Sequence, residues 1–240
     1  MNATLRVALL AGAVLAVTAC QTTDEQSGAD TRFESERFDD ARPAAISVRA
    51  GGCNPSDDIG SGSMIDADLA VTAAHVVAGA DEIDVVGADG ATRSADVVMF
   101  DPDLDLAVLR TSDPIGAPLI IGPPAEADDQ AVIVTVRGTD DDPDVVTARV
   151  RVERTVNIDT TDIYLEGDVT RPGFEVVADI ESGDSGAVVV LPGGRAGGMI
   201  WAKSTERMDR AWAIDLPAEL GDADVRASLI DAVDTGACTS

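Results

Sequence analysis

Short apolar segments separated by turn residues make up most of the chain between residues 44 and 216. Each segment is rich in Val, Ile, Leu or Ala, and clusters of Gly, Pro and Asp stand between them. Many short strands at this spacing favour a barrel or a sandwich over alternating strands and helices. The strands are expected at residues 45–48, 60–65, 69–72, 83–86, 92–99, 104–109, 131–136, 145–152, 161–165, 187–191, 196–201 and 211–214.

The proline-rich stretch at residues 117–124 divides these segments into two groups of six. We therefore predict an all-β fold of two six-stranded barrels, the first over about residues 44–120 and the second over about residues 125–216. A C-terminal helix is expected over about residues 223–233. Its apolar residues recur at helical spacing, at Val225, Leu229, Ile230 and Val233.

Acidic residues outnumber basic residues by 44 to 17 in the 240-residue chain, which gives a net charge of −27. Such a body repels nucleic acid and anionic membrane surfaces, so we expect no nucleic-acid partner. The hydrophobic content of 45% is enough for a sizeable core. The acidic residues either form a solvated surface or attract basic substrates, and the sequence leaves both interpretations open.

The N-terminus has the features of an export signal. Arg6 precedes an apolar run at residues 7–17, which is shorter than the ~20 apolar residues of a membrane-spanning helix. Small residues follow the run, and the pattern predicts a cleaved signal peptide at residues 1–19.

The end of this signal resembles a bacterial lipobox, with the sequence Val17-Thr18-Ala19-Cys20. The resemblance implies a lipid on Cys20, an anchor in a bacterial membrane and a location in the cell envelope. The alternative is an ordinary signal beside a cysteine. Residues 20–43 are polar and charged after the cysteine, and they predict a flexible tether.

The chain has a single histidine, His75, which precedes Asp105 and Ser185. A serine hydroxyl is a weak nucleophile that needs a neighbouring base and a third group to orient the base. Imidazole titrates near neutral pH, so His75 is the candidate base, Asp105 the orienting group and Ser185 the nucleophile. Asp101 and Asp103 compete for the orienting role, but both flank a proline and suit a turn.

Hydrolysis of a carbonyl compound by such a group also needs hydrogen-bond donors for the developing oxyanion. The candidates are the backbone N–H groups of Gly183 and Ser185, in the segment Gly183-Asp184-Ser185-Gly186. A glycine at position 183 allows the backbone bend that this arrangement requires.

Three motifs, in this order, resemble the chymotrypsin/trypsin-like serine peptidase family. They are Thr72-Ala73-Ala74-His75, Asp105-Leu106-Ala107-Val108-Leu109 and Gly183-Asp184-Ser185-Gly186. Their short spacing looks more like compact bacterial members, such as the Deg-type proteases, than like animal digestive enzymes. Over about residues 44–216 the resemblance implies Greek-key barrels, a His-Asp-Ser triad, an acyl-enzyme and protein or peptide substrates.

The resemblance also suggests a substrate pocket. Asp179 lies six residues before Ser185, where trypsin-like members place the acid that binds Arg or Lys of the substrate. Trp201 and Ala202 stand in the segment that resembles the family's pocket wall. However, Ala202 replaces a glycine of the family, and Trp212 stands where small residues are common. Asp179 is therefore either the pocket acid or one more solvent-facing carboxylate.

Two further features depend on the same comparison and on the export signal. In the animal enzymes the counterpart of Asp184 pairs with a new N-terminal amine, but no matching activation sequence lies near residue 44, so an internal Arg or Lys, or water, is expected instead. If Cys20 is acylated, Cys53 and Cys238 either pair with each other, as an oxidising compartment favours, or remain free or intermolecular thiols.

These features predict a lipid-anchored serine endopeptidase. One histidine and the two cysteines that remain beside Cys20 cannot build a usual zinc site, so no metal or cofactor is expected. A catalytically inactive, protease-like lipoprotein that binds peptides or proteins is the alternative. An acidic envelope lipoprotein that only spaces two surfaces is a third possibility, but it leaves the three ordered motifs unexplained.

Overall fold

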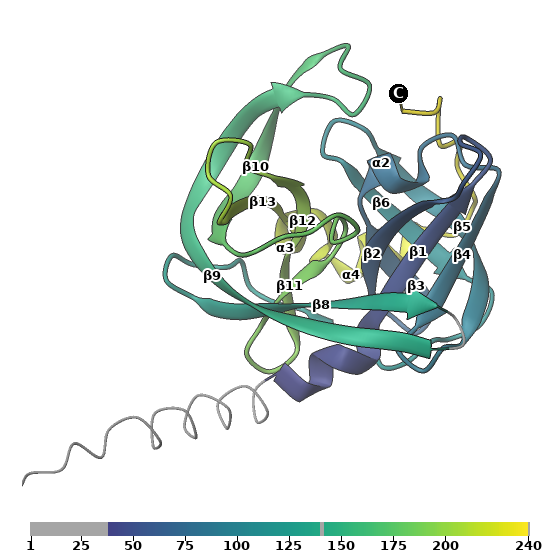
Figure 1. Ribbon diagram of the computed structural model, residues 1–240, viewed down its shortest axis with the longest axis horizontal. Coiled ribbons are helices and arrows are strands. Elements are labelled where there is room, and N and C mark those ends of the chain that lie inside the picture. Colours follow the sequence, from purple (N-terminus) through teal and green to yellow (C-terminus); the bar gives the residue numbers. More distant parts are fainter. Residues whose placement is uncertain (1–37, 140–141, 240) are drawn as a thin grey trace, which may run out of the picture.

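A closed six-stranded barrel forms the first half of the folded chain in the computed structural model, which describes residues 38–139 and 142–239 (Figure 1). Its strands follow the Greek-key order β1-β2-β3-β6-β5-β4, and every neighbouring pair is antiparallel. The short 3-10 helix η1 (Asp39–Ala44) precedes this barrel, and the one-turn helix α2 (Ala74–Val77) follows β3. The strands are β1 (Ala45–Gly51), β2 (Asp58–Met64), β3 (Leu69–Thr72), β4 (Glu82–Gly87), β5 (Thr92–Asp101) and β6 (Leu106–Thr111).

A second barrel lies beside the first (Figure 1). Six strands form a ring in the order β11-β8-β9-β10-β13-β12, which the β11–β12 pairing closes. The two-residue strand β7 (Ile120–Ile121) joins β12 in parallel and was not predicted. The ring strands are β8 (Gln130–Thr139), β9 (Asp142–Thr161), β10 (Asp168–Val177), β11 (Val188–Leu191), β12 (Arg195–Lys203) and β13 (Arg210–Asp215). The prediction of two six-stranded barrels is confirmed.

The apolar runs of β8 and β11 are buried on both faces. Because side chains alternate across a strand, one set of residues enters the second barrel and the other faces the first. In β11, Val189 and Leu191 belong to the core of the second barrel, whereas Val188 and Val190 belong to the larger cluster centred on the first barrel. These two-sided strands hold the barrels together, and β11 begins just after the segment that carries Ser185.

One predicted strand, at residues 161–165, is wrong. Residues 162–167 form a turn in which the Asp162 carboxylate accepts hydrogen bonds from the backbone N–H groups of Glu166, Tyr164 and Gly167, and these bonds lower the pKa of Asp162. The strand lies further on, as β10. It was missed because Pro172 lies within it, yet the pairing with β13 begins only at Gly173, so the proline interrupts no ladder on that side.

The C-terminal helix is shorter than predicted. Helix α3 (Leu216–Leu220) follows β13, and α4 spans Ala223–Ser228 rather than residues 223–233. Leu229 leaves the helical conformation, with φ −79° and ψ 75°. The tail then runs along the first barrel, where Arg110 donates to the Leu229 carbonyl and the Val233 N–H donates to the Val97 carbonyl. Helical spacing was misleading because the predicted apolar face is largely exposed, with Ile230 66% accessible.

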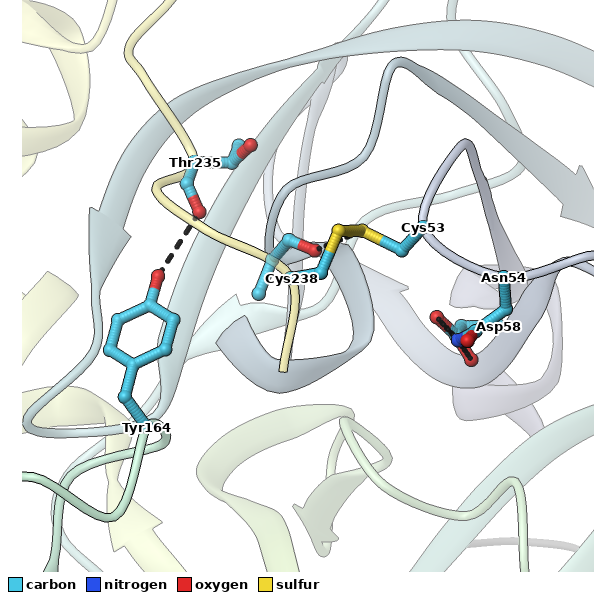
Figure 2. Close-up of a disulfide and its surroundings, with 7 residues drawn as sticks. Cys53, Asn54, Asp58, Tyr164, Thr235 and Cys238 are labelled. Carbon is cyan, nitrogen blue, oxygen red and sulfur yellow. Dashed lines mark hydrogen bonds between the residues drawn. A yellow bond between two sulfur atoms is a disulfide. The ribbon is translucent and has the colours of Figure 1, made fainter. Parts of the chain in front are cut away.

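A disulfide joins Cys53 to Cys238, with the Cα atoms 5.6 Å apart (Figure 2). It fixes the C-terminal tail beside α2, because the Cys53 sulfur lies 3.2 Å from the carbonyl oxygen of Ala78 and the Gly79 N–H donates to the Thr235 carbonyl. The Tyr164 hydroxyl of the second barrel donates to the same Thr235 carbonyl at 3.3 Å, as Figure 2 shows. The tail thus connects both barrels near helix α2, which contains His75.

The predicted signal peptide, Cys20 and most of the predicted tether lie outside the described residues. The prediction of a tether up to residue 43 is wrong at its end, because residues 39–44 form η1 and Phe38 and Ala41 are buried in the core. Within residues 38–139 and 142–239, no helix has the length and the apolar character needed to cross a membrane.

Removal of the disulfide should lower the stability of the folded state markedly. The bond closes a loop with a sequence separation of 185 residues, and the chain-entropy model gives up to about 5 kcal/mol for such a loop. The double variant Cys53→Ser/Cys238→Ser should therefore melt well below the wild type in calorimetry, by about 2–4 °C for each kcal/mol lost. Equal melting temperatures for the wild type, oxidised or reduced, and the double variant would contradict this account.

Candidate active site

His75 and Asp105 form a tightly connected pair. The ring Nδ1 atom lies 2.8 Å from Asp105 Oδ2 and 3.0 Å from Oδ1, and the His75 backbone N–H donates to Oδ1 at 2.9 Å. An ionised carboxylate only accepts, so Nδ1 carries the ring proton and Nε2 is left as the acceptor. Asp105 is 3% exposed, whereas about a third of the His75 side chain is accessible. The ring is therefore oriented from inside and open to solvent on its other side.

The backbone of the turn before β6 places this carboxylate. Asp105 has φ 60°, in the left-handed region that Asp tolerates better than most residues, and its carbonyl accepts from the Ala74 N–H. Asp101 caps the same turn, because its carboxylate accepts from the N–H groups of Asp103 and Leu104. The two competing aspartates thus belong to the turn, and Asp105 alone contacts the histidine ring.

The Ser185 segment is attached to the first barrel by Ser61 of β2. The Ser61 N–H donates to the Ser185 carbonyl at 2.8 Å, and its hydroxyl donates to the Gly183 carbonyl at 2.7 Å. Gly186 packs so closely on Ser61 and Ala73 that a Cβ atom would not fit there. In the described chain the Ser185 hydroxyl makes no hydrogen bond to the His75 ring. Such contacts are often long without substrate and shorten when it binds.

The two predicted oxyanion donors are free to bind a ligand. Gly183 has φ 93°, which requires glycine, and open space surrounds the position of an added Cβ. Among the described residues, the N–H groups of Gly183 and Ser185 have no protein acceptor. Ser185 itself is partly accessible, so a substrate carbonyl can approach both donors.

Asp184 has an internal arginine as its partner. This carboxylate is 1% exposed; Oδ1 accepts from Arg137 Nη2 at 2.8 Å and Oδ2 accepts from the Glu181 N–H at 2.9 Å. The hydrogen bond to Asp184 is the main reason that the pKa of Arg137 is raised above its ordinary value. Arg137 also contacts the exposed carboxylate of Glu181 at 2.8 Å. The sequence predicted an internal cation, or water, but could not select the residue.

Asp179 does not lie in a buried pocket, so the prediction of a buried pocket acid is wrong for this residue. The neighbouring residues Ala178 and Ile180 are buried. Asp179 between them points to the opposite side, where its side chain is 92% exposed. Its nearest cation is Lys203, the chain's only lysine, at 3.9 Å. The Lys203 ammonium group donates to the Ile180 carbonyl at 2.6 Å.

Trp201 and Ala202 lie on β12, both partly accessible. The Trp201 ring is covered by the guanidinium group of Arg171, whose Cζ atom is 4.3 Å from the ring centre. Sequence reasoning missed Arg171, Arg137 and Ser61, because single arginines and serines carry no pattern that predicts their partners. Across the described residues, no cluster of three or more His, Cys, Asp or Glu side chains is arranged to hold a metal ion.

Known proteins resemble this chain in sequence and in fold. The model of the trypsin-like peptidase domain family matches residues 60–199. The serine protease Rv3671c of Mycobacterium tuberculosis strain H37Rv is 28% identical over 182 residues, which is 75% of this chain and 45% of the relative. The chain thus spans less than half the length of that relative.

Solved structures share the fold. The active form of the M. tuberculosis protease Rv3671c superposes with a TM-score of 0.75 and 24% identity, over 98% of this chain and 100% of the other. The HtrA-type protease AlgW, solved with a decapeptide, gives a TM-score of 0.63 and 21% identity over 81% of this chain and 66% of the other. Because the family model covers more than half of the 240 residues and includes His75, Asp105 and Ser185, this chain belongs to the family of trypsin-like peptidase domains.

Proposed function

We propose that the chain is a serine endopeptidase in which Ser185 is the nucleophile, His75 the general base and Asp105 the group that orients the base. The observation that carries this proposal is the contact of both Asp105 oxygens with His75 Nδ1, which leaves Nε2 as a free acceptor on the accessible side of the ring. The attachment of the Ser185 segment to β2 supports it, because β2 and β3 lead into the helix that carries His75.

The reaction follows from these positions. Ser185 Oγ attacks the peptide carbonyl carbon while His75 Nε2 takes the hydroxyl proton, and Asp105 stabilises the imidazolium. The carbonyl oxygen becomes an oxyanion that accepts from the N–H groups of Gly183 and Ser185. The imidazolium then returns the proton to the leaving amine, and the acyl group remains on Ser185 Oγ. A water molecule releases it by the same sequence of proton transfers.

The substrates in this proposal are proteins or peptides, since the solved neighbours include an HtrA-type protease bound to a decapeptide. The exposed position of Asp179 gives no support to a preference for Arg or Lys. The binding alternative, an inactive lipoprotein that recognises peptides, has the same fold. Only the reactivity of Ser185 separates the two.

We also propose that the protein is exported and anchored to a bacterial membrane through a lipid on Cys20. The apolar run that ends in Val17-Thr18-Ala19-Cys20 supports this proposal. The described fold begins at Phe38, so 17 residues separate the cysteine from the folded body.

An organophosphonate probe should label the wild-type protein at Ser185. The Ser185→Ala variant should lose all labelling, and His75→Ala should slow it by at least about 1,000-fold, because the base that activates the hydroxyl is gone. Ser182→Ala, which removes an exposed serine of the same segment, is the control and should label like the wild type. A folded wild-type protein that does not react would support the binding alternative.

Replacement of Arg137 by Met should lower kcat/KM by about 100-fold, similar to the loss of one oxyanion donor. The change leaves the buried carboxylate of Asp184 without its cation, so the segment that carries both donors should rearrange. Glu181→Gln, which removes the exposed partner of the same arginine, should change kcat/KM less than threefold. If both variants hydrolyse peptides at the wild-type rate, the arginine does not support the oxyanion site.

Replacement of Cys20 by Ala should move the protein from the detergent phase to the aqueous phase in a two-phase partition of cell extracts. The reason is that the thiol that would carry the lipid is missing, and acyl chains contribute about 0.8 kcal/mol per buried methylene group to membrane binding. Thr23→Ala, in the same segment, should stay in the detergent phase. An unchanged partition of the Cys20→Ala protein would rule out the anchor.

A further inference from the structure

Arg171 is a buried cation between the candidate catalytic pair and the substrate wall. It lies on β10 and is 2% exposed. Its Nε atom donates to the Asp103 carbonyl at 2.6 Å, and Nη2 donates to the Thr161 carbonyl at 3.1 Å. Nη1 lies 3.9 Å from Asp105 Oδ2, the oxygen closest to the His75 ring. Arg171 of the second barrel therefore lies next to Asp105, the carboxylate that the first barrel places beside His75.

The burial of both partners distinguishes this contact. The side chains of Arg171 and Asp105 are 3% and 5% exposed, whereas the arginines that pair with the buried carboxylates Asp184 and Glu175 are at least 14% exposed. Charges interact more strongly in such a site than at the surface. Burial lowers the pKa of Arg171, and Asp105 is the largest influence that opposes this effect, followed by Asp101, Asp103 and Asp162. A guanidinium group nevertheless stays charged at neutral pH.

The same guanidinium group supports the substrate wall. Its Cζ atom lies over the Trp201 ring, 4.3 Å from the ring centre, an arrangement in which a cation is attracted to the ring face. The indole Nε1 atom is buried and has no hydrogen-bond partner among the described residues. Packing and the stacked guanidinium group, rather than a hydrogen bond, therefore fix the ring. Trp201 is one residue from Ala202 in the wall segment, on a strand paired with β13.

We propose that Arg171 is a positioning residue with two effects: its charge limits how readily the His75–Asp105 pair takes up a proton, and its stacked plane holds Trp201 in place to bind substrate. The first effect keeps Nε2 available as a base at lower pH. The second links the binding of substrate to the catalytic carboxylate through one side chain. This inference rests on the proposed peptidase function, but its first half concerns the histidine ring and can be measured without turnover.

The charge effect has a defined sign. Without Arg171, the negative charge of Asp105 is compensated less, so the pair binds a proton more tightly. In Arg171→Met the acidic limb of the kcat/KM profile should move up by about one pH unit, and the NMR titration of the His75 ring should move with it. His75 is the chain's only histidine, so with a histidine-free tag this signal needs no assignment.

Two further variants separate the effects. Arg171→Lys keeps the positive charge but loses the planar group, so it should keep the pH profile and raise KM about fivefold or more, with little change in kcat. Arg151→Gln is the matched control, because it removes an arginine from β9 whose partners are Asp128 and Glu153 rather than Asp105. It should change neither the His75 titration nor KM.

The outcomes are decisive for each half of the inference. An unshifted His75 titration in folded Arg171→Met overturns the charge effect, and an unchanged KM in Arg171→Lys overturns the support of Trp201. If Arg171→Met does not fold, Arg171→Lys decides alone: a shifted titration or an unchanged KM overturns the proposal. Failure of the peptidase function itself gives a different result, in which the wild type resists the phosphonate probe while its His75 titration remains measurable.

Discussion

Two hydrogen bonds from Ser61 connect the candidate nucleophile to the barrel that carries its base. Ser61 is 2% exposed, and its N–H and hydroxyl groups donate to the carbonyls of Ser185 and Gly183. The Ser61 carbonyl accepts from the hydroxyl of Thr72, which lies just before helix α2 and His75. The remaining geometry depends on this contact between barrels, because neither barrel alone contains both His75 and Ser185. The two-sided strands β8 and β11 also pack apolar side chains against both barrels, and this burial stabilises the same contact.

Five arginines of this acidic chain pair with carboxylates that are buried. Asp105 has Arg171, Asp184 has Arg137, and Glu175, which is fully buried, is surrounded by Arg154, Arg207 and Arg210. An isolated buried carboxylate would be neutralised or would destabilise the fold, so these arginines are needed in the interior. The surface then keeps most of the net charge of −27. That distribution fits a solvated acidic exterior better than a specific attraction for basic substrates.

Sequence patterns predicted the features that repeat along the chain and missed those that depend on distant partners. The alternation of apolar segments and turns was sufficient for the two barrels. Motif order predicted His75, Asp105 and Ser185 as the site, and the structure brings His75 and Asp105 into contact. The pattern failed at β10, where Pro172 lies within a strand whose pairing with β9 continues through the proline. It also failed at residues 229–233, where the tail bonds to β5 instead of continuing a helix. Arg171 and Asp179 were out of reach because their roles depend on burial, which local sequence does not determine.

The most direct test of the account compares two pH dependences in the wild-type protein. One is the NMR titration of the His75 ring, and the other is the rate of labelling of Ser185 by the phosphonate probe. If His75 is the base that activates Ser185, both curves must share one midpoint, because no other histidine exists in the chain. A labelling rate that stays constant while the ring gains its proton would contradict the triad.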